Sequence, residues 1–97
     1  MATFISLFNF TDQGIRNVKD TTKRYEAANA LAQKMGVKIT HFFYTMGPYD
    51  CVAVCEAKSE EDFNAFTLTV AGAGNIRSLT LRAFSVEDMS RIISKMA

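Results

Sequence analysis

The residues best suited to chemistry lie around one predicted turn, Gly47-Pro48-Tyr49-Asp50. Aspartate is depleted in strands, so Asp50 at the start of an apolar strand either accepts hydrogen bonds from turn amides or belongs to a binding site. Tyr49 is either a partly exposed lid over the edge of the core or a ligand contact. Both roles stay open, because perturbed carboxylates occur in structural networks as well as at functional sites.

A second set of chemically capable residues contains His41, the only histidine, with Glu56 and Arg82. A two-residue turn would place His41 directly opposite Glu56 on neighbouring antiparallel strands. Such a pair could perform acid/base chemistry, or it could neutralise charge inside a buried interface. We favour the interface network, because charged groups at interfaces commonly contribute only complementarity.

The pattern gives no support for metal, disulfide or nucleotide chemistry. One histidine and two thiols, Cys51 and Cys55, fall short of a set of zinc ligands. In a strand rising about 3.3 Å per residue the two cysteines would lie about 13 Å apart, beyond the Cα limit of about 7 Å for a disulfide. The glycine-rich stretch 72–77 follows a helix and enters a strand, the reverse of the phosphate-binding context. We predict no metal and no cofactor.

The composition is that of an ordinary soluble globular protein. The 97 residues are 48% hydrophobic and 22% charged, with a net charge of +1, so neither nucleic acid nor a membrane is expected as a partner. No apolar run reaches the roughly 20 residues that span a bilayer, and the start lacks the basic region of a secretory signal. We expect one cytoplasmic domain over residues 1–97, small enough that a second copy would help to complete its burial.

Alternating aromatic and β-branched residues predict strands at residues 3–10, 37–46, 50–57 and 75–84. Helical spacing of apolar residues predicts a first helix from Ile15 to Gly36, with Gly14 and residues 19–22 as places where it divides.

Two further helices begin at capping patterns. Ser59 with Asp62 opens a helix that ends at Gly72, and Ser85 with Asp88 opens a last helix with an apolar stripe.

This order of elements fits the ferredoxin-like βαββαβ topology, an α+β fold with a four-stranded antiparallel sheet, plus a C-terminal helix. Right-handed crossovers place both main helices on one face and leave the other bare. Small residues on the third strand suit close helix packing, so the side of the hairpin that carries Cys51, Ala53 and Cys55 is assigned to the helices. Leu79 and Leu81 are assigned there too.

The predicted open face then has an aromatic and polar composition, because Phe4, Ser6 and Phe8 of the first strand and Arg82 and Phe84 of the fourth belong to it. An apolar patch of that size needs a cover, most simply the sheet of another copy.

The sequence resembles the GYD family of small bacterial proteins, named for a Gly-x-Tyr-Asp signature that corresponds here to Gly47, Tyr49 and Asp50. The stretch VAVCEA follows the signature, as the apolar strand ending in Glu-Ala does in the family. The similarity extends to residues 10–20 and 74–84 and covers the chain up to about Phe84.

This resemblance implies a dimeric α/β barrel. Members of the wider superfamily include cofactor-free monooxygenases, haem-degrading enzymes, muconolactone isomerase-like proteins and stress-response proteins. Many of these relatives bind their ligand between sheet and helices of one protomer, which directs attention to Asn9, Thr11, Gly14, Tyr25 and Tyr44. The histidine that binds haem in the haem-degrading relatives has no evident counterpart here.

Two functions follow as hypotheses. The first is a homodimer or higher homo-oligomer that binds a small apolar or aromatic metabolite, as a binder or as a cofactor-independent enzyme with no assigned catalytic residue. The second is a non-catalytic assembly or regulatory module that acts through sheet-to-sheet pairing. A trimer of the nitrogen-regulatory type would need a long basic nucleotide-binding loop, which this sequence lacks. The ligand-binding candidates are Asn9, Thr11, Gly14, Tyr25, Tyr44, Tyr49, Asp50 and Arg77, and the open-face or interface candidates are His41, Glu56 and Arg82.

Overall fold

The elements of the structure, a computed structural model that describes residues 1–97, follow the predicted order. The strands are β1 (Ala2–Phe10), β2 (Val37–Tyr44), β3 (Cys51–Ala57) and β4 (Ile76–Ala83). The helices are α1 (Asp12–Arg16), the 3₁₀ helix η1 (Val18–Asp20), α2 (Thr21–Lys34), α3 (Glu60–Gly72) and α4 (Val86–Ser94). The first predicted helix is therefore divided, as the sequence indicated.

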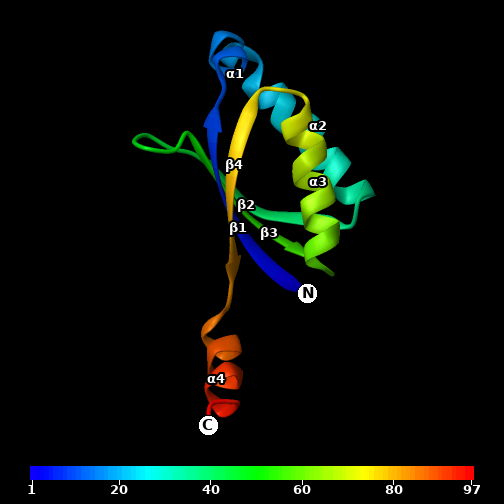
Figure 1. Cartoon of the computed structure of the whole chain (residues 1–97). Helices are drawn as coiled ribbons and strands as arrows, with labels where there is room; N and C mark the ends of the chain where they lie inside the picture. The colour runs from blue at the N-terminus through cyan, green and yellow to red at the C-terminus, as the bar shows by residue number, and fades with distance from the viewer.

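The four strands form one antiparallel sheet in the order β2-β3-β1-β4. Helices α2 and α3 cover one face of this sheet, and no helix covers the other (Figure 1). One-sided cover is the result that right-handed crossovers from β1 to β2 and from β3 to β4 produce. The arrangement confirms the ferredoxin-like α+β fold.

The hairpin between β2 and β3 has a longer loop than the predicted pairing assumed. The amide of Thr45 donates to the carbonyl of Asp50 at 2.8 Å, which leaves four residues in the loop instead of two. His41 consequently lies opposite Val54, and the predicted pairing of His41 with Glu56 was wrong. From His41 to Tyr44 this register differs by two residues, so the side chains there keep the faces that were predicted for them. A register shift between Ile39 and His41 interrupts the alternation and puts Ile39, opposite Cys55, on the covered face.

The predicted face of β1 was wrong. Phe4, Ser6 and Phe8 lie opposite the small side chains of β3 and face the helices. The ring of Phe4 stacks on that of Phe63 in α3, with centroids 4.4 Å apart. The small side chains of β3 leave space above the sheet, and the phenylalanines of the neighbouring strand fill part of it.

The two faces of β4 were also predicted the wrong way round, because β4 pairs with β1. Arg82 lies opposite Phe4, with its guanidinium 5.5 Å from the centre of that ring, so its assignment to the open face was wrong. Leu79 and Leu81 face away from the helices and lie 47% exposed. The prediction failed because it gave the covered positions to the most apolar residues of β4, whereas neighbouring strands share faces through their register.

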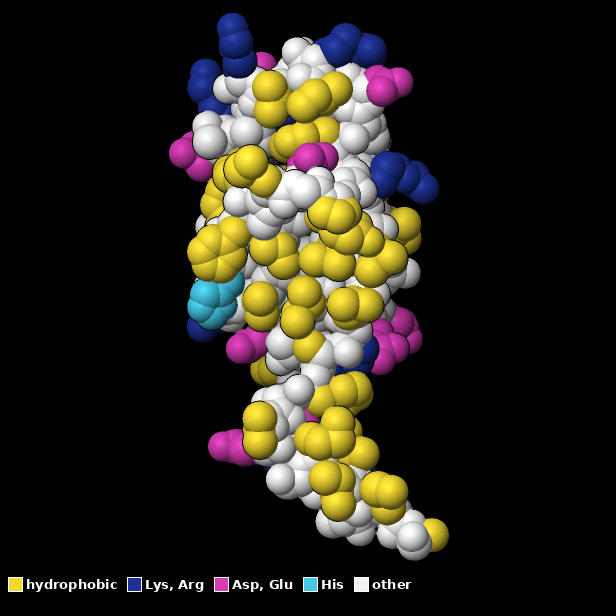
Figure 2. Space-filling view, turned by 90° about the vertical axis from the view of Figure 1, so that its left-hand side faces the viewer, with side chains coloured by type: hydrophobic (Ala, Val, Ile, Leu, Met, Phe, Trp, Pro, Cys, Tyr) yellow, Lys and Arg dark blue, Asp and Glu magenta, His cyan; other side chains and the backbone are white.

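Hydrophobic side chains dominate the open face of the sheet (Figure 2). They come from all four strands and form one continuous group by register: Ile5, Leu7, Phe43, Val52, Val54, Leu79 and Leu81. The open face is thus more uniformly apolar than the sequence suggested.

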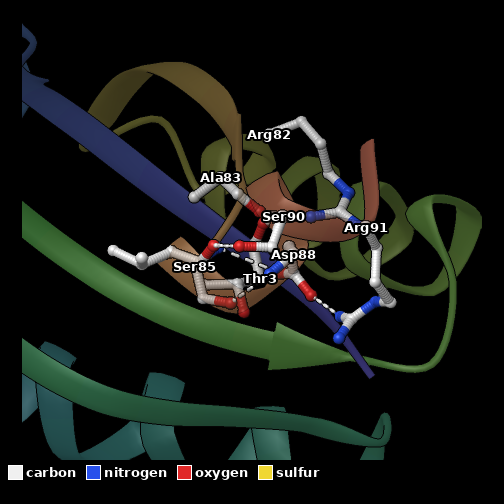
Figure 3. A network of polar contacts seen from close by, with 8 residues as sticks. Thr3, Arg82, Ala83, Ser85, Asp88, Ser90 and Arg91 are labelled. Carbon is white, nitrogen blue, oxygen red and sulfur yellow. Dashed lines mark hydrogen bonds and ion pairs between the residues drawn. The ribbon is translucent and has the colours of Figure 1, made fainter. Parts of the chain in front are cut away.

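Helix α4 extends away from the body of the molecule (Figure 1). Its start is fixed locally by a capping box, in which Ser85 and Asp88 exchange hydrogen bonds of 3.0 Å between side chain and backbone amide (Figure 3). The amide of Ser85 lowers the pKa of Asp88, and Arg91 also pairs with that carboxylate. The apolar stripe of the helix stays exposed: Val86, Met89, Ile92, Ile93 and Met96.

Asp50 connects the hairpin loop to β1. Its carboxylate accepts a hydrogen bond from the amide of Phe10 at 2.9 Å, and its own amide donates to the carbonyl of Phe8 at 2.8 Å. Gly47, with a φ of 108°, occupies a conformation that other residues rarely adopt. The carbonyl of Tyr49 accepts from the hydroxyl of Thr45 at 2.6 Å. Each residue of the signature therefore has a role in shaping or anchoring the loop.

Replacing Asp50 by alanine should lower the free energy of unfolding by about 1–2 kcal/mol, because the amide of Phe10 loses a charged acceptor in a half-buried site. Urea titration measures the loss. Tyr49→Phe is the matched control and should change stability by less than about 0.5 kcal/mol, since the Tyr49 hydroxyl makes no hydrogen bond. Equal stability of the two variants would contradict the anchoring role.

Candidate functional site

A cleft of about 400 Å³ lies between α2, α3 and the covered face of the sheet. We call it the sheet–helix cleft. Its walls are mainly hydrophobic, and most of its lining comes from five elements, β1, α2, β2, β3 and α3. The lining residues are Phe8, Phe10, Thr21, Arg24, Tyr25, Ala27, Ala28, Leu31, Ile39, Phe42, Tyr44, Cys51, Ala53, Cys55, Phe63, Phe66, Thr67, Thr69, Val70, Ala73, Asn75 and Ile76.

The distribution of side-chain size explains where the cleft lies. The floor is made by the small residues Cys51 and Ala53 of β3, and one wall by Ala27 and Ala28 of α2. Beyond them the buried core closes the space, with Phe63 among the large side chains that fill it. Large residues at one end and small ones at the other leave an opening between the two helices.

Three aromatic rings form a connected wall of the cleft. Tyr25 of α2 and Phe42 of β2 have ring centroids 4.5 Å apart, and Tyr44 meets Phe42 edge-on at 5.2 Å. The hydroxyl of Tyr44 lies 3.3 Å from that of Thr21 at the start of α2. The structure therefore brings the predicted candidates Tyr25 and Tyr44 to one cavity.

Arg24 is the one charged residue among those that line the cleft, and the sequence analysis missed it. Its guanidinium donates to the carbonyl of Asn17 at 2.8 Å and to that of Gly14 at 3.4 Å. A helical signal could have found it, because Thr21, Arg24, Tyr25 and Ala28 follow the i, i+3, i+4, i+7 spacing of one helix face. The predicted stripe followed apolar spacing, so it contained Tyr25 and Ala28 of this face but passed over Arg24.

Thr11 and Gly14 hold the segment that precedes α2. The Thr11 hydroxyl donates to the carbonyl of Gly74 at 2.6 Å and accepts from the amide of Gly14 at 3.0 Å. A Cβ atom at Gly14 would meet the carbonyl oxygen of Asn75 at 2.0 Å, so only glycine allows α1 to approach that turn. These two candidates do not line the cleft; they fix the segment before α2 against the turn at residues 74–75.

The other candidates lie away from the cleft. Asn9 and Arg77 are opposite each other on the open face, where His41 and Glu56 also lie. Arg82 donates to the carbonyls of Thr3 and Ala83 near the start of α4 (Figure 3), with its Nε atom 4.0 Å from Glu60.

Thiol groups face the cleft from β3. Burial, reinforced by the negative charge of Asp50, raises the pKa of Cys51 to about 11. Burial alone raises the pKa of Cys55 to about 11. No group of three His, Cys, Asp or Glu side chains could hold a metal ion, and no helix is long and apolar enough to cross a membrane.

The raised thiol pKa values predict a loss of stability in alkali. The fold favours the protonated thiols, so their contribution should be complete below the ordinary pKa of 9.0 and should decrease as the pH rises towards about 11. Urea titration between pH 8 and 11 should show a steeper decline for the natural chain than for the Cys51→Ala, Cys55→Ala double variant. An equal decline of the free energy of unfolding in the two proteins would contradict a destabilising role of thiol ionisation.

Similarity to known proteins extends over nearly the whole chain. The family model for the GYD domain matches residues 4–93. A relative from Thermus thermophilus, named glutamine synthetase and cystathionine beta-lyase binding protein, is 32% identical over 90 residues, 92% of this chain and 95% of that protein.

Two solved structures are similar to this one in fold. The crystal structure of TTHA0845 from Thermus thermophilus gives a TM-score of 0.63 at 23% identity, over 89% of this chain and 96% of the other. The crystal structure of an FFRP chain gives 0.62 at 17% identity, over 87% and 100%. With a family model matching nearly its whole length, this chain belongs to the GYD domain family.

Proposed function

We propose that this chain is a homo-oligomeric binding protein, in its simplest form a homodimer, that holds a small apolar or aromatic metabolite in the sheet–helix cleft. The cleft itself carries the proposal, because a volume of about 400 Å³ with mainly apolar walls matches the usual make-up of a ligand pocket. Tyr25, Phe42 and Tyr44 would contact the ligand through their rings, and the Tyr44 hydroxyl would supply one polar contact.

The chemistry of the cleft favours binding over cofactor-independent catalysis. Cys51 and Cys55 are the nucleophile candidates in its lining, and pKa values of about 11 keep both thiols protonated near neutral pH. A protonated thiol is a poor nucleophile. His41 belongs to the opposite face of the sheet and is turned away from the ligand position.

Self-association is supported by the open face of the sheet. Leu79 and Leu81 lie nearly half exposed within an apolar group that spans all four strands. Large exposed apolar surfaces of this kind are characteristic of interfaces, and a two-fold dimer covers such a surface with an identical one. His41, Glu56 and Arg77 would contribute polar groups to the same interface.

A neutral fluorescent probe, N-phenyl-1-naphthylamine, tests the binding proposal. Ala28→Phe places a ring in the cleft and should raise the Kd of the probe about ten-fold or more, because the ring occupies the ligand volume. Ala30→Phe is the matched control, since Ala30 is exposed on the same helix and outside the lining. Equal probe affinity in the two variants, measured by fluorescence titration, would refute binding in the cleft.

A second candidate function is a regulatory or assembly module that acts by binding other proteins. The name of the Thermus thermophilus relative, which describes it as a binding protein for two enzymes, favours this function. The apolar open face of the sheet and the exposed stripe of α4 offer surfaces for such contacts.

Sedimentation velocity tests the second candidate. The chain is measured alone and with purified glutamine synthetase from the organism that produces the chain. Leu81→Asp should convert the oligomer to monomers and abolish co-sedimentation, because a charge in an apolar interface is strongly disfavoured. Leu68→Asp, on the exposed side of α3, should leave both unchanged. An enzyme that never co-sediments with the oligomer would rule out this partner.

A further inference from the structure

The lining of the sheet–helix cleft contains one cationic group and is otherwise uncharged. Arg24 is the charged lining residue, and the lining contains no aspartate or glutamate. No carboxylate of the chain lies within 4.0 Å of its guanidinium, since the ion pairs are those of Arg82 with Glu60 and of Arg91 with Asp88. A half-buried cation without an anionic partner is an arrangement that an anionic ligand group would complete.

The guanidinium of Arg24 is held in place by the backbone. One terminal nitrogen donates to the carbonyl of Asn17 and the other to that of Gly14, so two of its five N–H donors are used and three remain. Backbone anchors at two points fix the orientation of the group, which reduces the entropy lost when it binds a further acceptor. Planar acceptors such as carboxylates suit the fork geometry of arginine.

Neutral polar groups lie beside this cation. Thr21 and Tyr44 bring their hydroxyls within 3.3 Å of each other, and Thr21 precedes Arg24 by one helical turn. Hydroxyl groups can donate to an anion as well as accept from a neutral group. Most of the remaining lining is apolar and includes residues such as Phe42, Ala53 and Phe66.

We propose that the cleft binds an amphipathic carboxylate, with its hydrocarbon or aromatic body among the apolar walls and its carboxylate at Arg24. This proposal rests on the proposed function and adds the chemical class of the ligand. Arg24 would act as the residue that determines specificity for an acid over a neutral molecule of the same shape. The binding step is non-covalent and requires no co-reactant.

Matched pairs of acid and amide test the proposal: 1-naphthaleneacetate with 1-naphthaleneacetamide, and decanoate with decanamide. Calorimetric titration of the full chain should give the acid of at least one pair an affinity about ten-fold or more above its amide, the ratio expected for a hydrogen-bonded charge. Arg24→Gln should abolish this ratio while amide binding persists, a result that a merely structural role of Arg24 would not produce. Arg24→Lys should keep part of the ratio and serves if the glutamine variant fails to fold.

Arg16→Gln is the control for general surface charge, because Arg16 is exposed in α1 and outside the lining. It should leave the acid-to-amide ratio unchanged. Equal affinities for acid and amide in the natural chain, or equal losses in Arg16→Gln and Arg24→Gln, would overturn the proposal. Cleft binding would survive that result if the neutral probe still distinguishes Ala28→Phe from Ala30→Phe, so the two failures are distinguishable.

Discussion

The row of small side chains along β3 determines where the helices can close on the sheet. Cys51, Ala53, Cys55 and Ala57 are all buried on the covered face, yet none of them reaches far above it. Phenylalanines must then supply the bulk, and they do so mainly where Phe4 and Phe63 stack. Cys51 and Ala53 instead line the cleft together with alanines of α2, and the space between them is not filled by other side chains.

This uneven filling gives the molecule two separate apolar surfaces on opposite sides of one sheet. The cleft is concave and aromatic, and it suits a small molecule. The open face is broad and apolar, and it suits another sheet. Because β3 and β1 contribute side chains to both surfaces in alternation, a one-residue change in their register would exchange the two sets of residues. The hydrogen bonds from Asp50 to β1 help to fix that register at the hairpin end of the sheet.

The sequence was sufficient for the order of elements, because strand alternation and helix capping are encoded within a few residues. The capping box at Ser85 is the plainest case. Register was harder: a loop of four residues instead of two moved His41 away from Glu56, and nothing local to the strands distinguishes these loops. The faces of β1 and β4 were predicted wrongly because hydrophobicity ranked Leu79 above Arg82 for a covered position. The guanidinium of Arg82 instead packs over the rings of Phe4 and Phe84. These contacts reduce the cost of placing an arginine rather than a leucine on the covered face.

The site was predictable from the sequence only in part. Tyr25 and Tyr44 could be named because the resemblance pointed to the space between sheet and helices, and both line it. Arg24 was missed because the helix was read from its apolar residues alone. Its position one residue before Tyr25 and three after Thr21 places it on the helix face that lines the cleft.

Helix α4 combines a locally encoded start with an apolar stripe that touches little of its own chain (Figure 1). Nine residues are fewer than an isolated helix needs to persist in water. The capping box thus selects the point and direction of nucleation, while the helical state itself depends on whatever surface shields the stripe. Amide hydrogen exchange in this segment would then slow when that surface is occupied and accelerate when it is free, so the exchange rate of this helix would report association.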